Sequence, residues 1–165
     1  MATILVIDDS QSILHGVERA LSRSGHTVLT SDSGGKAIPM LGKTRVDLVI
    51  TDMYMPGGDG VQVIQHARRS APGVAVLAMS GRPPEANLFP IARALGAIGT
   101  LQKPFGVKQL LHAVALALNQ DPAGPEYLWA HDNSFGALLE DDPPAEGEAP
   151  REQPAETGAH TLTKS

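Results

Sequence analysis

Five side chains that could take part in chemistry stand at the ends of apolar runs rich in β-branched residues. Asp8 and Asp9 close the first run, Asp52 closes the third, Ser80 closes the fourth, and Lys103 lies just past the fifth. Open parallel sheets bind their ligands at the carboxyl ends of their strands. If the runs are such strands, these side chains converge on one site.

The residue types at these positions suit phosphoryl chemistry. Clustered carboxylates repel one another and favour a hard cation with oxygen ligands, for which we expect Mg²⁺. A metal beside Asp52 would neutralise charge on an incoming phosphoryl group and orient it for in-line attack. The Lys103 ammonium supplies a second positive charge. The Asp52 carboxylate can then act as a nucleophile and form an acyl phosphate.

Each of these residues also has an ordinary structural interpretation. Asp9 precedes Ser10 and a predicted helix, so it could serve as a helix cap. Ser80 stands before Gly81, as a residue that starts a turn often does. Lys103 alone would be read as a solvated surface lysine. The coincidence of all of them at successive strand ends favours the chemical interpretation.

The elements that must position these residues alternate along the chain. Strands are predicted at 3–8, 26–30, 46–51, 74–79 and 97–101, and helices at 10–24, 34–42, 58–70, 84–95 and 107–119. Strands that are apolar nearly throughout are buried on both faces, as in a parallel sheet covered by helices. The pattern predicts an α/β doubly wound domain of five strands and five helices. We expect Pro39 and Pro90 to shorten or kink their helices, because an interior proline costs about 3 kcal/mol.

Composition excludes several classes of protein. The 165 residues, 42% of them hydrophobic, suffice for one domain with a sizeable core, and the absence of cysteine excludes disulfides and thiolate chemistry. The start of the chain has no basic region of a secretory signal, and no apolar stretch approaches the roughly 20 residues of a membrane span. We therefore expect a cytoplasmic protein without a membrane partner.

The net charge of −5 is unevenly distributed. Residues 1–120 hold 11 Lys and Arg against 8 Asp and Glu, whereas residues 121–165 hold 2 against 10. Neither part has the dense basic patch of a nucleic-acid-binding protein, so we expect no nucleic acid as a partner. We predict a domain at 1–120 and an acidic, proline-rich and largely disordered tail at 121–165.

The tail segment 125–139 carries Tyr127, Trp129 and Phe135, half of the six aromatic residues of the chain. Aromatic side chains contribute strongly at contacts and are uncommon in disordered tails. We treat the segment as a candidate docking segment that packs on the domain, over the fourth and fifth helices, or binds a partner protein. The remaining alternative is an exposed tail that carries these aromatics without a contact.

Four motifs closely resemble the receiver domains of bacterial two-component response regulators. They are VIDDS at 6–10, TDMYMPGGDG at 51–60, MSG at 79–81 and KPF at 103–105, and their order and spacing both match over roughly residues 1–120. The resemblance implies the flavodoxin-like strand order 2-1-3-4-5, known from the chemotaxis member of this family. A single-domain receiver followed by a tail is therefore expected.

The resemblance also assigns roles to the residues. Asp52 looks like the phosphorylated aspartate, and Asp8 and Asp9 look like the acidic pair that binds Mg²⁺ together with Asp52 and the backbone carbonyl of Tyr54. Ser80 resembles the hydroxyl residue that binds the phosphoryl group and acts in the switch. Lys103 resembles the lysine that contacts the phosphoryl group, and the family has a cis peptide bond before the following proline.

One position departs from the family pattern. Thr100 stands where most receivers carry a switch aromatic, three residues before the lysine. Threonine cannot fill the volume of an aromatic ring, so we expect the switch to be muted or to use other residues. The plain alternative is that threonine simply suits a β-strand there.

The function expected from these features is that of a stand-alone response regulator. A sensor histidine kinase or a histidine phosphotransfer protein would donate the phosphoryl group, and an unknown downstream protein would read it by protein–protein contact. The chain would catalyse only its own phosphorylation and dephosphorylation, as a monomer or weak homodimer.

The alternatives are a phosphorelay shuttle or phosphate sink, an unphosphorylated scaffold, and a phosphatase with an aspartyl nucleophile. A phosphatase of this kind usually needs a carboxylate two residues after the nucleophile, where this chain has Tyr54.

Overall fold

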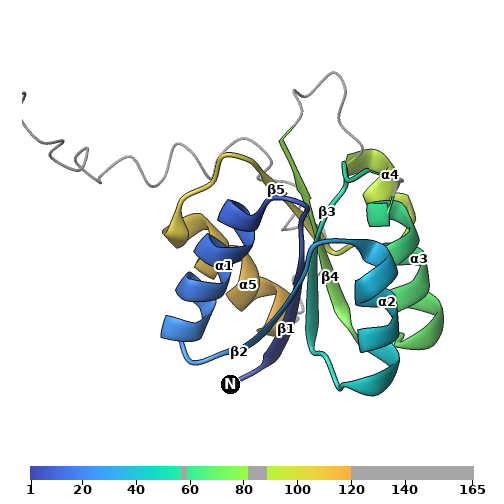
Figure 1. The fold of residues 1–165 in the computed structure, drawn as a ribbon, viewed down its shortest axis with the longest axis horizontal. Coiled ribbons are helices and arrows are strands. Elements are labelled where there is room, and N and C mark those ends of the chain that lie inside the picture. Colours follow the sequence, from blue (N-terminus) through green and yellow to red (C-terminus); the bar gives the residue numbers. More distant parts are fainter. Residues whose placement is uncertain (57–58, 82–88, 120–165) are drawn as a thin grey trace, which may run out of the picture.

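The computed structural model describes residues 1–56, 59–81 and 89–119, which form a parallel sheet between two layers of helices (Figure 1). The strands are β1 (Thr3–Ile7), β2 (Thr27–Ser31), β3 (Leu48–Asp52), β4 (Ala75–Ser80) and β5 (Gly99–Gln102). The helices are α1 (Gln11–Arg23), α2 (Gly34–Lys43), α3 (Asp59–Ser70), α4 (Phe89–Ala94) and α5 (Val107–Asn119). The strand order is β2-β1-β3-β4-β5, which confirms the predicted flavodoxin-like fold.

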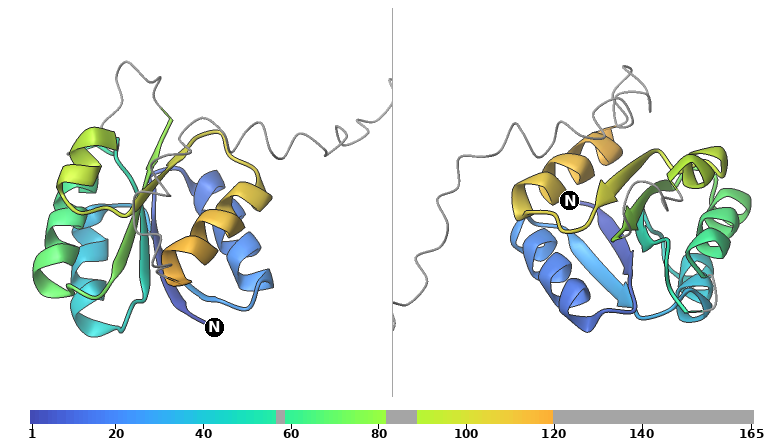
Figure 2. Two further views of the ribbon diagram at one scale, coloured as in Figure 1. Left: turned by 180° about the vertical axis from the view of Figure 1, so that it is seen from behind. Right: turned by 90° about the horizontal axis from the view of Figure 1, so that it is seen from above.

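Two apolar cores hold the sheet between its helical layers. Helices α1 and α5 cover one face, and α2, α3 and α4 cover the other (Figure 2). Successive residues of a strand point to opposite faces. Along β1, Ile4 and Val6 therefore join the core under α1 and α5, while Leu5 and Ile7 join the core on the other face. Burying each such side chain contributes about 1.5–3 kcal/mol, which explains why the four buried positions of β1, residues 4–7, carry no polar residue.

The strand register brings the carboxyl ends of the strands to one edge of the sheet. Ile7 of β1 is level with Thr51 of β3, so Asp8 and Asp52, which follow these two residues, lie side by side. Further along the sheet, Ser80 of β4 is level with Gln102 of β5, the residue before Lys103. The backbone pairing of the sheet therefore assembles these side chains at one place.

One of the two prolines departs in part from the sequence-based expectation. Helix α2 continues from Gly34 to Lys43 with Pro39 inside it, so the prediction that Pro39 shortens this helix is wrong. Pro39 is exposed, while Ala37 and Leu41 of the same helix are buried in the core and hold it against the sheet. Tertiary packing thus outweighs one lost hydrogen bond.

Helix α4 is described only from Phe89, so the first five residues of the predicted helix at 84–95 lie outside the described residues. Pro90 is the second residue of the described helix, and the expectation that it shortens or kinks its helix remains a prediction. The tail at 121–165, with its docking segment 125–139, also lies outside the described residues, and both remain predictions. No helix within the described ranges is long and apolar enough to cross a membrane.

Candidate functional site

Asp8 is held in place by the turn that leads from β1 into α1. Its side chain is fully buried, and its Oδ1 accepts a hydrogen bond of 2.9 Å from the backbone N–H of Ser10. Its own N–H donates to the carbonyl oxygen of Ser31 at 3.1 Å. Ser10 takes the N-cap position of α1, so the alternative that Asp9 caps this helix is wrong. The Asp9 side chain is exposed beside the buried carboxylate.

Asp52 is the last residue of β3 and is only 5% exposed. Its Oδ1 accepts a hydrogen bond of 3.0 Å from the backbone N–H of Tyr54. The N–H of Met53 donates to the carbonyl of Met79 at 2.9 Å, which extends the pairing of β3 with β4. The strand ladder and the loop after β3 together orient the Asp52 carboxylate.

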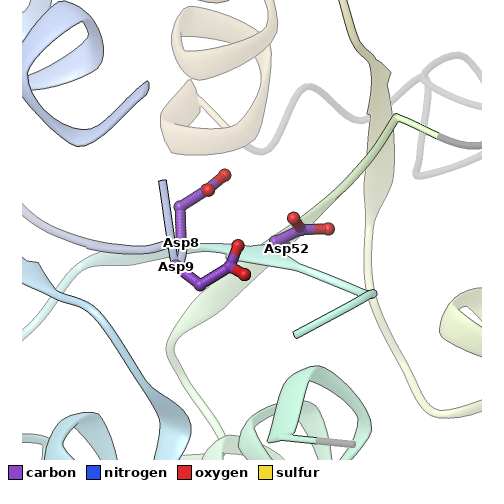
Figure 3. A group of neighbouring side chains, drawn as sticks. All are labelled: Asp8, Asp9 and Asp52. Carbon is purple, nitrogen blue, oxygen red and sulfur yellow. The ribbon is translucent and has the colours of Figure 1, made fainter. Parts of the chain in front are cut away.

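Asp8, Asp9 and Asp52 form a cluster of carboxylates (Figure 3). One oxygen from each lies within 4.8 Å of the others. Mg²⁺ prefers carboxylate oxygens and usually keeps several water ligands. The donor set fits this ion, because three carboxylates supply oxygens and the exposed side of Asp9 leaves access for water. The backbone N–H of Tyr54 donates to Asp52, which places the Tyr54 backbone next to the cluster. That the Tyr54 carbonyl is a metal ligand remains a prediction.

Lys103 bridges two of the three carboxylates. Its Nζ donates to Asp8 Oδ2 at 2.5 Å and to Asp52 Oδ2 at 2.7 Å. The Lys103 side chain is only 15% exposed, so these two ion pairs are largely shielded from contact with water. The residue is placed by its own backbone, whose N–H donates to the carbonyl of Ser80 at 2.7 Å, and the Lys103–Pro104 bond is cis as the family resemblance implies.

The electrostatics of the site follow from burial and from this bridge. Burial raises the pKa of Asp8 above the usual aspartate value and outweighs the opposing hydrogen bonds from Lys103 and Ser10. Burial alone would lower the pKa of Lys103, but hydrogen bonds to Asp52 and Asp8 outweigh it, so this pKa lies above its usual value. Lys103 therefore remains a cation at any physiological pH.

Ser80 and Thr100, the two predicted switch residues, occupy different places. Ser80 ends β4 and is fully buried, and its carbonyl oxygen accepts the hydrogen bond from the backbone N–H of Lys103. Thr100 lies within β5, level with Ala78 of β4, and is half-buried. Their roles in a switch remain predictions.

Gly60 is a residue of the site that the sequence analysis missed. A Cβ at this position in the first turn of α3 would lie 2.1 Å from the carbonyl oxygen of Asp52 and 2.8 Å from the Cα of Met53. Only glycine allows α3 to approach the backbone of the aspartate so closely. The available signal was that Gly60 closes the motif at 51–60, but this position does not show how closely the glycine approaches the backbone of Asp52.

Comparison with known proteins identifies the family. The sequence profile described as the response regulator receiver domain matches residues 4–115. The chain belongs to this family. It is a receiver domain of a two-component response regulator, and receivers interact with histidine kinases or phosphotransfer proteins, can dimerise, and typically bind Mg²⁺ at an acidic pocket.

Individual relatives agree with this assignment. The DNA-binding transcriptional regulator NtrC of Azospirillum brasilense is 33% identical over 120 residues, which cover 73% of this chain and 25% of NtrC. A response regulator receiver domain protein from Clostridium thermocellum is 31% identical with a TM-score of 0.67, covering 74% of this chain and 98% of that structure. Chemotaxis protein CheY4 of Vibrio cholerae is also 31% identical, with a TM-score of 0.66 and coverage of 72% and 99%. The receiver thus spans about a quarter of the length of NtrC but nearly the whole of these two solved structures.

Replacing the bridging lysine should destabilise the receiver. In EDTA at pH 7, Lys103→Met should lower the free energy of unfolding by about 2 kcal/mol or more, because the buried carboxylates of Asp8 and Asp52 lose their counter-charge. Chemical denaturation measures this loss. Lys43→Met, which removes an exposed lysine at the end of α2, is the matched control and should change stability by less than about 0.5 kcal/mol.

The loss of unfolding free energy in Lys103→Met should depend on pH with a defined sign. Since the pKa of Lys103 is raised, its contribution is fully present below the usual lysine pKa of about 10.4 and disappears only as pH rises through its higher folded value. Toward acid, Asp8 takes up a proton above the usual aspartate range, so the difference should shrink as pH falls. Equal losses for the two lysine variants would contradict the bridge.

Adding a methyl group at Gly60 should disturb the same site from its backbone side. Gly60→Ala should lower the free energy of unfolding by about 1–3 kcal/mol, because α3 must move away from Asp52. Gly16→Ala, in α1 with no atom within 4 Å of the added carbon, should instead stabilise by up to about 1 kcal/mol. Thermal and chemical denaturation of both variants checks the contrast, and a Gly60→Ala protein as stable as wild type would refute the close approach.

Proposed function

We propose that Asp52 accepts a phosphoryl group from the phosphohistidine of a sensor histidine kinase or of a histidine phosphotransfer protein. The phosphorylated receiver then signals by protein–protein contact with a downstream target. The observation that carries this proposal is the position of the Asp52 carboxylate, which lies within 4.8 Å of two other carboxylates and 2.7 Å from the Lys103 ammonium.

The residues divide the work of the transfer. An Asp52 oxygen forms a bond to phosphorus while the bond from phosphorus to the donor nitrogen breaks, and the imidazole leaves with the electron pair. Asp8, Asp9, Asp52 and the Tyr54 carbonyl would hold Mg²⁺, which supplies positive charge for the phosphoryl oxygens when bound. Lys103 supplies a fixed cation beside the acceptor, and the Ser80 hydroxyl binds the phosphoryl group.

The proposed catalysis acts on the chain itself. Water hydrolyses the acyl phosphate and regenerates the Asp52 carboxylate, so the receiver catalyses only its own phosphorylation and dephosphorylation. The DNA-binding activity in the name of NtrC belongs to that protein and is not carried over to this chain, which matches a quarter of it. Stand-alone action, cytoplasmic location, the absence of a nucleic-acid partner and the oligomeric state remain predictions.

One observation favours a second function, that of a phosphorelay shuttle or phosphate sink. Thr100 on β5 is half-buried and too small to act as an aromatic switch. A shuttle needs the phosphoryl chemistry at Asp52 but no conformational readout at the surface. The acceptor chemistry is the same in both cases, so they differ only in what phosphorylation changes beyond the site.

The acceptor itself can be tested by intact-mass spectrometry. With acetyl phosphate and Mg²⁺, the wild-type receiver should gain one phosphoryl group, and Asp52→Asn should gain none because an amide has no nucleophilic anion. Asp32→Asn is the matched control: Asp32 follows β2 at the same edge of the sheet but pairs with Lys36 at 2.8 Å. It should be labelled like the wild type. Labelling of Asp52→Asn would place the acceptor elsewhere.

Beryllofluoride with Mg²⁺ separates the switch from the sink, because it mimics the phosphoryl group without turnover. A switch should shift backbone amide resonances of α4, β5 and α5 as well as those next to Asp52. A sink should shift only the resonances around Asp8, Asp52, Ser80 and Lys103. Asp52→Asn under the same conditions controls for non-specific effects of the ion.

A further inference from the structure

An apolar groove lies between α1 and α5, beside the edge of the sheet that carries the phosphoacceptor. Its volume is about 170 Å³, and its apolar lining comes from Ile13, Val17, Ala20, Phe105, Val107 and Leu110. Val107 is 59% exposed and is one of three large apolar side chains that the described residues expose. Small-molecule sites usually measure about 300–1,000 Å³. The groove therefore suits a single large side chain of a peptide better than a cofactor.

A basic rim borders this groove along α1. It consists of Arg19 and Arg23, which are both exposed and lie one turn apart on α1, next to the face that lines the groove. Ser12 and Gly16 line the groove and fall close to the same face as the two arginines. No acidic residue lines the groove. A ligand that joins an apolar anchor to acidic residues fits this surface.

We propose that the chain's own segment 125–157 docks there. Its first part, 125–139, carries Tyr127, Trp129 and Phe135, and its second part, 140–157, holds seven acidic residues and one basic residue. The Trp129 side chain of the first part fills the groove, and the acidic part lies along the basic rim. This inference goes beyond the proposed function, because docking requires no chemistry at Asp52.

The connection is long enough. The described chain ends at Asn119, the last residue of α5, and the groove reaches Leu110 on the same helix. At 1.5 Å per residue, that part of α5 is about 14 Å long. Residues 120–126 can span up to about 23 Å when extended. Segment 125–139 can therefore return along α5 to the groove.

Charge favours this groove over the hollows nearer to Asn119. Two larger hollows, of about 370 and 660 Å³, lie at the opposite edge of the sheet. Both are lined by Asp47, and Arg45, which also lines the smaller hollow, is paired with that carboxylate at 3.9 Å, so neither hollow has the net basic border of the groove. The groove between α1 and α5 combines an apolar lining with a basic border and carries no such carboxylate.

Trp129, the only tryptophan of the chain, reports on docking directly. In the full chain, acrylamide should quench its fluorescence about threefold less efficiently than in the urea-unfolded protein, because a docked indole is shielded from water. Val107→Asp and the double variant Arg19→Glu/Arg23→Glu should each restore most of the quenching, as should high salt. Ile91→Asp and Arg45→Glu are matched controls on exposed residues away from the groove, and both should leave Trp129 protected.

Several results would overturn the proposal. Quenching in the wild type equal to that of the unfolded chain would show that Trp129 is not docked. Loss of protection in Arg45→Glu but not in Arg19→Glu/Arg23→Glu would place the segment at the opposite edge. Protection that grows with protein concentration would show binding to a second copy. Labelling of the same samples by acetyl phosphate tests Asp52 separately, so either proposal can fail without the other.

Discussion

The site depends on the cost of holding three carboxylates together at the edge of a sheet. Two unit charges 4 Å apart repel by about 4 kcal/mol at the effective dielectric constant of a protein surface. Asp8 and Asp52 are buried, so water relieves little of this repulsion, and the Lys103 ammonium between them offsets it. The excess negative charge that remains is what makes the site receptive to a hard cation.

The fold supports this arrangement by making the edge of the sheet rigid. β1 and β3 lie next to each other in the sheet and have cores on both faces, so the carboxylates that follow them have little freedom to move apart. Gly60 adds a third support, because it lets α3 press against the backbone of Asp52. Contacts on outer surfaces, such as the docking proposed for the groove between α1 and α5, can then form without loosening the site.

Sequence patterns predicted most of the fold because strand burial and helix periodicity are local properties. The predicted bounds of every strand lie within two residues of the observed ones. The predicted bounds of the helices lie within one residue, except for α4. The strand order followed from the family resemblance. The failures have different physical causes. Packing of Ala37 and Leu41 on the core keeps α2 intact around Pro39, and Ser10 rather than Asp9 takes the N-cap position of α1.

The sequence by itself determined which residues could do chemistry, since carboxylates, a hydroxyl and an ammonium at successive strand ends can meet only where parallel strands end together. Only the tertiary structure decided how they meet: Lys103 donates to both Asp8 and Asp52, Asp9 faces solvent, and Gly60 touches the carbonyl of Asp52. The physical reason is that residue type and spacing constrain the backbone, whereas side-chain pairing across 51 or 95 residues depends on the packing of the whole sheet.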